Sequence, residues 1–201
     1  MNYRDFHRRT IADPEGFWAE QAELIDWQDK PRQILDASRL PFTRWFVGGT
    51  TNLCHNAVDR WLATQADSPA LIHISTEVGA ADINERTWTF AELAREVNRM
   101  AATLQSLGVG RGDRVLVYMP MIPEAVFAML ACARIGAIHS VVFGGFAAVS
   151  LANRIDDATP KVVVSADAGS RAGKVVPYKP LLDEAIERSP VSYTHLRAHE
   201  T

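Results

Sequence analysis

The sequence predicts an α/β fold built on a mainly parallel sheet. Between residues 109 and 188, short uninterrupted apolar runs alternate with segments that have helical periodicity. Uninterrupted apolar runs are typical of strands that are covered on both faces of a parallel sheet. The alternation of strand and helix implies right-handed crossover connections. An apolar fraction of 47% and a charged fraction of 22% agree with a folded globular protein.

The first part of the chain predicts a helical lead-in followed by an irregular arm. Asp13 is a good N-cap, Pro14 suits the first position of a helix, and apolar residues follow at helical spacing. From residue 28 to residue 50, prolines and glycines interrupt the chain and no apolar period is sustained. Three aromatic residues of this stretch are interpreted as contacts that hold the arm on a larger body: Phe42, Trp45 and Phe46.

A further helix is predicted from residue 52, where Asn52 is a candidate cap. Cys54 and His55 are neighbours in it, but no second pair of metal ligands lies nearby, so we interpret them as ordinary helix positions. Its expected apolar face holds Leu53, Ala57, Val58, Trp61 and Leu62.

Two strands and the clearest helix of the sequence come next. The strands are predicted at residues 70–75 and 86–90. Thr89 then caps a helix, Glu92 completes a capping box, and Gly108 ends the helix.

The parallel part of the sheet is predicted in the last third of the chain. Buried strands are expected near residues 114–118, 138–143 and 161–166. Helices are expected between and after them, at residues 122–136, 147–159 and 180–188.

A glycine turn follows the second of these strands. Ligands of open α/β sheets bind beyond the carboxyl ends of the strands. Phe143, Gly144 and Gly145 lie at such a place, where glycines let a ligand approach the backbone and the helix behind them favours an anion. From the two glycines alone, a tight structural turn is the favoured interpretation.

A basic loop follows the third strand. Arg171 and Lys174 flank Ala172 and Gly173, and two cations beside small residues suit phosphate groups. Asp167 either caps this segment or points into the site. The alternative is a solvated basic loop without a ligand.

Charge and composition exclude several classes of protein. The net charge is -3 and no basic stripe is present, so no nucleic-acid partner is expected. The longest apolar run is about half of the ~20 residues that span a bilayer, so no membrane segment is expected. Cys54 and Cys132 lie far apart, which argues against a disulfide framework and for a cytoplasmic location. No metal site is predicted.

Four segments carry a family resemblance: residues 17–27, 44–62, 89–147 and 154–186. Together they resemble the N-terminal part of short-chain acyl-CoA synthetases, which belong to the adenylate-forming (AMP-binding) superfamily. The resemblance runs from residue 1 to about residue 188. The acetyl-CoA synthetase branch shares GDRV, YMPMIPEA and ACARIGAIHSVVFGGF. The propionyl-CoA synthetase branch is more similar in IDWQ and in SADAGSRAGKVVPYKPLLDEAI.

The resemblance implies an enzyme that activates propionate, or another short carboxylate, with ATP and then transfers the acyl group to coenzyme A, with Mg²⁺ offsetting phosphate charge. It also implies an N-terminal arm followed by an incomplete, mainly parallel-sheet part of the large domain. The ATP phosphate loop, the acyl pocket and the mobile C-terminal domain of such enzymes lie further along, so no catalytic residue is expected in this chain. The missing remainder of the domain is then its structural partner.

Part of the coenzyme A nucleotide site carries over by the same resemblance. The Phe-Gly-Gly turn matches Phe143, Gly144 and Gly145, and the basic loop matches Arg171, Ala172, Gly173 and Lys174. Acetyl-type members usually have arginine where this chain has Lys174. Lysine keeps the charge and loses the fork geometry of a bidentate phosphate contact.

The expected organisation is an N-terminal arm over residues 1–60 and a truncated AMP-binding domain over residues 61–190. Residues 191–201 match, codon by codon, the translation of a transposase-type sequencing adapter and are expected to be non-native. His195 and His199 of this tail are therefore not interpreted as metal ligands. The chain alone is expected to be inactive. Three alternatives to a propionate-activating synthetase remain. They are an acetyl-CoA synthetase fragment, a non-catalytic CoA- or nucleotide-binding module and, as the weakest, a scaffold protein.

Overall fold

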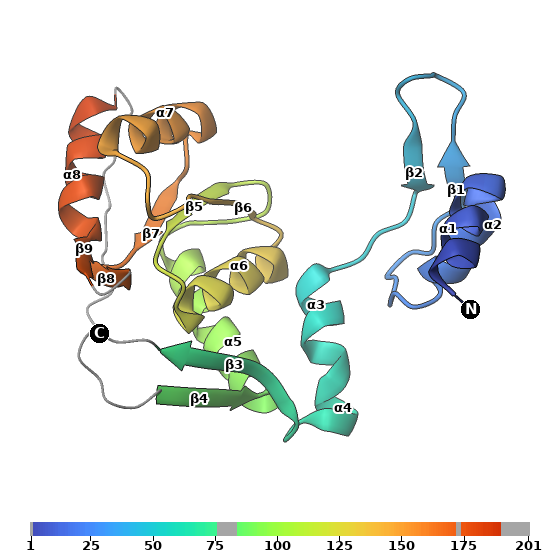
Figure 1. The fold of residues 1–201 in the computed structure, drawn as a ribbon, viewed down its shortest axis with the longest axis horizontal. Helices are drawn as coiled ribbons and strands as arrows, with labels where there is room; N and C mark the ends of the chain where they lie inside the picture. The colour runs from blue at the N-terminus through green and yellow to red at the C-terminus, as the bar shows by residue number, and fades with distance from the viewer. Residues whose placement is uncertain (1, 76–83, 172–173, 190–201) are drawn as a thin grey trace. The chain divides into compact units, whose positions relative to one another are not determined.

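The computed structural model describes residues 2–75, 84–171 and 174–189 (Figure 1). The chain divides into two compact units, residues 1–56 and 57–201. The tail 191–201 and the residues 172–173 lie outside the described part of the chain.

The first unit begins with two helices, which are followed by a hairpin. Helix α1 spans Tyr3–Ala12 and helix α2 spans Pro14–Ala22. The Asp13 carboxylate accepts the Gly16 N–H at 3.0 Å, which confirms the predicted cap and the helix that begins at Pro14. Strands β1 (Gln33–Asp36) and β2 (Arg44–Val47) pair antiparallel.

Aromatic side chains pack against one another in this unit, around the buried Phe17. Phe17 is 1% exposed and meets the Trp18 ring edge-on at 5.2 Å. Trp45 lies 6.2 Å from Trp18, and Phe46 lies 5.7 Å from Trp27, whereas Phe42 is exposed. The stretch expected to be irregular therefore contains a hairpin, and two of its three aromatic residues pack within their own unit.

The helix expected from Asn52 is broken. Helix α3 spans Leu53–Ala57, a single 3₁₀ turn follows at Asp59–Trp61, and helix α4 spans Leu62–Gln65. The backbone leaves helical geometry at Val58, with φ −128° and ψ −62°. Leu53 is 63% exposed, so the prediction of one continuous apolar face was wrong.

The two strands and the long helix that follow are confirmed. Strands β3 (Pro69–Ser75) and β4 (Asn84–Thr89) pair antiparallel, and helix α5 spans Phe90–Ser106. Glu92 donates its backbone N–H to the Thr89 hydroxyl at 3.2 Å, and the Glu92 carboxylate accepts the Thr89 N–H at 2.9 Å. The predicted capping box is therefore present.

Parallel strands β5 (Arg114–Tyr118), β6 (Ile138–Val141) and β7 (Val162–Ser165) form a sheet in the order β6-β5-β7. Helix α6 (Pro123–Ile135) connects β5 to β6, and helix α7 (Ala148–Ala158) connects β6 to β7.

The chain moves outward from β5 to β6 and then back past β5 to β7. Two right-handed crossovers of this kind place α6 and α7 on opposite faces of the sheet, as Figure 1 shows. Helix α5 packs beside α6, and helix α8 (Tyr178–Arg188) packs beside α7. The prediction of parallel strands alternating with helices is confirmed, and β5 and β7 are buried as expected. Burial was wrong for β6, where Ile138 and Val141 are exposed at the edge of the described sheet. The other strand pairs of the described chain are antiparallel.

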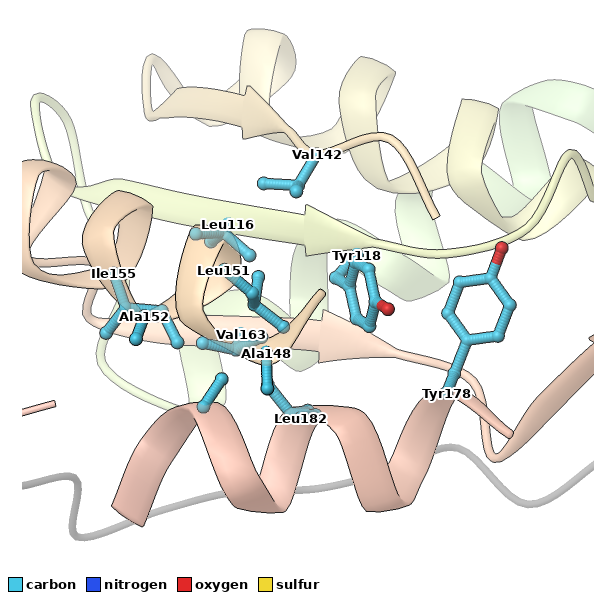
Figure 2. Packing of buried hydrophobic residues seen from close by; sticks show 11 residues of the cluster. Leu116, Tyr118, Val142, Ala148, Leu151, Ala152, Ile155, Val163, Tyr178 and Leu182 are labelled. Carbon is cyan, nitrogen blue, oxygen red and sulfur yellow. The ribbon is translucent and has the colours of Figure 1, made fainter. Parts of the chain in front are cut away.

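The core between the sheet and helices α7 and α8 is apolar and extends to the carboxyl end of β5 (Figure 2). Leu116 of β5 and Val163 of β7 face Leu151 and Ile155 of α7, and all four are 1% exposed or less. Burial at about 25 cal/mol per Å² of apolar area is the main stabilising contribution here. The cluster ends in two tyrosines, Tyr118 and Tyr178.

Candidate functional site at the carboxyl edge of the sheet

The site lies where the strand order reverses. Strand β5 is central, and the connections that leave β5 and β6 run to opposite faces of the sheet. In open α/β sheets the crevice for a ligand opens at this reversal, outside the carboxyl ends of the strands. The segments that meet there follow Tyr118, Val141 and Ser165.

The Phe-Gly-Gly turn lies at this edge, as predicted. Phe143 is 60% exposed, and its ring meets the Phe146 ring edge-on at 6.0 Å. The guanidinium carbon of Arg154 lies 4.8 Å from the centre of the Phe146 ring. The Phe146 ring is therefore in contact with both the exposed Phe143 ring and the Arg154 guanidinium.

Gly144 is in close contact with Tyr178. A methyl group built at Gly144 would lie 1.8 Å from Oη and 2.5 Å from Cζ of Tyr178. No side chain fits at this position without displacing the tyrosine or the turn. The glycine that the sequence offered as an approach for a ligand thus also has a packing role.

The basic segment is a hairpin and not a loop. Strand β8 (Ala168–Arg171) pairs antiparallel with strand β9 (Lys174–Pro177), and Arg171 is the ladder partner of Lys174. Lys174 is exposed. Ala172 and Gly173 lie outside the described residues, and the placement of the Arg171 side chain is not described either. The hairpin follows β7 directly, so it starts at the same edge of the sheet as the Phe-Gly-Gly turn.

The base of the hairpin is fixed by its own polar groups. The Asp167 carboxylate accepts the Ala168 N–H at 2.8 Å, and the Asp167 carbonyl accepts the Lys179 N–H at 3.0 Å. The sequence left two roles open for Asp167, to cap the segment or to point into the site. The hydrogen bond with the Ala168 N–H supports the capping role. A methyl group built at Gly169 would lie 2.8 Å from Cβ of Pro120, so the β5–α6 connection packs directly on β8.

Beneath the turn and the hairpin, the end of β5 carries buried polar groups. The Ser165 hydroxyl donates to the Tyr118 carbonyl at 2.8 Å. The Tyr118 side chain is 0% exposed, and within the described part of the chain its hydroxyl has no hydrogen-bond partner. Burial, and then the neighbouring Tyr178 hydroxyl, raise the pKa of Tyr118. Tyr118 therefore stays a neutral phenol at physiological pH.

The described part of the chain has neither a metal-ligand cluster nor a membrane-spanning helix. No three His, Cys, Asp or Glu side chains come together there to hold a metal ion. Cys54 and Cys132 are both buried, and burial raises the pKa of the Cys132 thiol to about 11. No described helix is long and apolar enough to cross a bilayer.

A family model named AMP-binding enzyme matches residues 58–198. The chain belongs to the AMP-binding enzyme family. A second family model, the acetyl-coenzyme A synthetase N-terminus, matches residues 3–57. The two matches meet within one residue of the boundary between the two compact units of this AMP-binding chain.

Relatives within this family are close. The chain is 61% identical to the propionate–CoA ligase of Salmonella typhimurium and 59% identical to that of Escherichia coli, over 98% of this chain in both cases. It is 53% identical to the acetyl-coenzyme A synthetase of Thiobacillus denitrificans, over 94% of this chain. The chain spans 31% of each of the two ligases and 28% of that synthetase.

A solved structure of the same kind is also similar. Acetoacetyl-CoA synthetase from Streptomyces lividans superposes with a TM-score of 0.85 at 29% identity, over 98% of this chain and 30% of that one. The fold expected from the family resemblance is therefore confirmed for this part of an AMP-binding enzyme.

Sequence reasoning found the turn and the basic segment of this AMP-binding chain, and it missed the side chains beneath them. Tyr118 reads as one more apolar strand residue, and Tyr178 reads as part of the lead-in to a helix. Arg154 lies within α7 whereas Phe146 lies before its first residue, so no helical spacing signals their contact. No local pattern signals a contact between Tyr178 and Gly144.

Proposed function

We propose that this chain is the N-terminal part of a propionate-activating acyl-CoA synthetase. The observation that supports propionate is the 61% and 59% identity to two propionate–CoA ligases, against 53% to the acetyl-coenzyme A synthetase of Thiobacillus denitrificans. Acetate is the alternative substrate, because the acyl pocket is expected beyond this chain.

The proposed reaction has two steps. A carboxylate oxygen of propionate attacks the α-phosphorus of ATP, which forms propionyl-adenylate and releases pyrophosphate. The coenzyme A thiol, losing its proton, then attacks the adenylate carbonyl carbon and displaces AMP. Mg²⁺ bound with ATP offsets phosphate charge, and the described residues of this chain form no cluster that would hold it.

The contribution proposed for this chain is part of the coenzyme A nucleotide site. The exposed Phe143 ring offers a flat apolar face on which adenine stacks, next to Gly144 and Gly145. Lys174 and Arg171, paired across the hairpin ladder, supply positive charge for phosphate groups, with Ala172 and Gly173 between them.

Coenzyme A titration by calorimetry tests this site. We expect saturable binding to the chain and a loss of about tenfold or more in affinity for Arg171→Ala, since a charge-assisted hydrogen bond contributes about 1.5–3 kcal/mol. Lys174→Ala should lose less, because a lysine makes no bidentate contact. Arg188→Ala is the matched control: it removes one positive charge from α8, where Arg188 pairs with Glu184 at 2.7 Å. Equal affinities for all of these chains would refute the site.

The chain alone is proposed to lack ligase activity. The phosphate loop, the acyl pocket and the mobile domain expected for the first step lie outside it. Propionate- and ATP-dependent release of pyrophosphate by the purified 201-residue chain would contradict this.

A non-catalytic CoA-binding module is the rival function. It would bind coenzyme A in the same titration, so the encoding DNA beyond codon 190 discriminates the two. A genomic reading frame that continues after codon 190 into a full synthetase supports the enzyme. It also supports the proposed organisation, with an arm at 1–60, a domain at 61–190 and a non-native tail at 191–201. A genomic stop codon after the present tail supports the module. A cytoplasmic location is proposed with either function.

A further inference from the structure

One tyrosine ring touches both segments of the proposed coenzyme A site. Tyr178 is 7% exposed, and Figure 2 shows its ring reaching from the start of α8 toward the end of β5. Its Oη lies against Gly144 of the turn, 1.8 Å from where a methyl group there would stand. Its Cε2 lies against Gly169 of the hairpin, 3.0 Å from the corresponding position.

The ring is also anchored to the central strand. The centres of the Tyr178 and Tyr118 rings lie 4.9 Å apart with an interplanar angle of 45°. Tyr118 is 0% exposed and ends β5, which is paired on both of its edges. Pro120, two residues further on, packs on Gly169. The position of Tyr178 is therefore fixed by the most buried strand of the sheet.

We propose that Tyr178 is a positioning residue that sets the spacing between the Phe143–Gly145 turn and the Ala168–Pro177 hairpin. The inference rests on the proposed function, because the two segments matter together only if one nucleotide reaches both. Phe143 stands on the turn and Lys174 on the hairpin, and the adenine and phosphates of one ligand have a fixed reach. A shift of either segment then separates the stacking contact from the charge contact.

Two substitutions separate the parts of this role. Tyr178→Phe keeps the ring against Tyr118 and Gly169 and removes only Oη, so its dissociation constant for coenzyme A should stay within about threefold of the parent. Tyr178→Leu removes the ring and should raise that constant roughly tenfold. Tyr3→Leu, at a tyrosine that is 79% exposed, is the control and should change nothing.

A reciprocal pair tests the contact itself. Gly144→Ala forces a methyl group onto Tyr178 and should weaken coenzyme A binding. The double variant Gly144→Ala/Tyr178→Leu should bind no worse than Tyr178→Leu alone, because the clash is then absent. Gly110→Ala is the matched control, since a methyl group there meets its nearest atom, a carboxylate oxygen of Asp113, at 3.7 Å.

Two readouts distinguish positioning from loss of folded protein. Partial unfolding lowers the number of binding sites per chain, whereas mispositioning lowers the dependence of the dissociation constant on salt, because the cations no longer reach the phosphates. Hydrogen exchange should also rise in both segments, 142–146 and 168–171, in Tyr178→Leu without coenzyme A, and it should stay unchanged in α5.

The outcomes are distinct. Faster exchange in both segments, with a smaller salt dependence, supports the proposal. Exchange that rises only in α8, or uniformly over the chain, overturns it, as does a Tyr178→Leu chain that binds coenzyme A with unchanged affinity. If the parent chain binds no coenzyme A and both segments still loosen, the proposed function fails while the role of Tyr178 in spacing the segments stands.

Discussion

Arg114, the first residue of β5, binds the end of helix α7 at the amino edge of the sheet. The Arg114 guanidinium donates to the carbonyl oxygens of Ala158 and Thr159, at 2.9 and 3.1 Å, and to the Thr159 hydroxyl at 2.8 Å. Thr159 ends α7 with φ +42°, an unfavourable conformation for a β-branched residue. The three hydrogen bonds offset that cost and satisfy the last carbonyls of the helix.

Asp113, the residue before β5, makes stability depend on pH. Its carboxylate accepts the Gly110 N–H at 2.8 Å and pairs with Lys161 Nζ at 3.0 Å, and these two contacts hold its pKa below the ordinary value of 3.8. A lowered pKa in the folded state means that the stabilisation is complete above the ordinary pKa and is lost as the pH falls through the lowered one.

We therefore predict that Asp113→Asn reduces the loss of stability between pH 6 and about pH 3. Urea unfolding at both pH values measures it, as the difference in free energy of unfolding. Lys161→Gln, which removes the second contact, should give a smaller effect in the same direction. An unchanged difference in the Asn variant would show that Asp113 does not contribute to acid unfolding.

Among the helices, α5 has the most complete N-terminal cap. Its capping box satisfies two backbone groups reciprocally, and its buried face consists of Leu93, Ala94, Val97, Ala101 and Leu104. Cap and apolar stripe are both local signals, which explains why this helix was predicted with correct ends.

We predict that Thr89→Ala lowers the free energy of unfolding by about 1 kcal/mol, as removal of an N-cap hydroxyl typically does. Thr89→Ser should retain most of the stability, because serine keeps the accepting oxygen. Thr103→Ala is a control on the same helix, where the hydroxyl donates to the Arg99 carbonyl within the helix. A Ser variant as destabilised as the Ala variant would count against a capping contribution.

Elements whose signals are local were predicted, and elements that depend on a partner were not. Strand β5 could be predicted because Val115, Leu116 and Val117 form an uninterrupted apolar run. Such a run is typical of a strand covered on both faces, and all three residues are buried. The β1–β2 and β8–β9 hairpins were missed, since four-residue strands carry little period and are stabilised by their pairing. The same distinction holds for the candidate site. The positions of Gly144 and Lys174 after predicted strands placed them at the carboxyl edge of the sheet from sequence alone. The contact of Gly144 with Tyr178 joins residues 34 positions apart and could be found only in the structure.

Across the second unit, the parallel sheet leaves an apolar strand at its border. In the described part of the chain β6 pairs with β5 on one edge only, and Ile138 and Val141 of β6 are 55% and 54% exposed. An unpaired strand edge with apolar side chains is a site for association with another strand.

We predict that the isolated chain self-associates with increasing concentration and that Val141→Lys suppresses this. A lysine on an edge strand opposes pairing through charge repulsion and through the cost of burying its ammonium group. Sedimentation velocity over a concentration series measures the association. Val149→Lys, at an apolar residue of α7 that is 53% exposed, serves as the control. Association that is unaffected in both variants would place the contact elsewhere.

The apolar core of the second unit continues to the candidate site, because Tyr178 belongs to the core, packs on Tyr118 and also contacts Gly144 and Gly169. A substitution of Tyr118 or Tyr178 that alters ligand preference also removes core contacts. Changes in specificity made at these two positions therefore lower the stability of the unit. Evolution of this edge then requires prior stabilisation elsewhere in the unit. Phe143, which is exposed, and Lys174 on the hairpin are free of that constraint and are the positions at which ligand preference can drift.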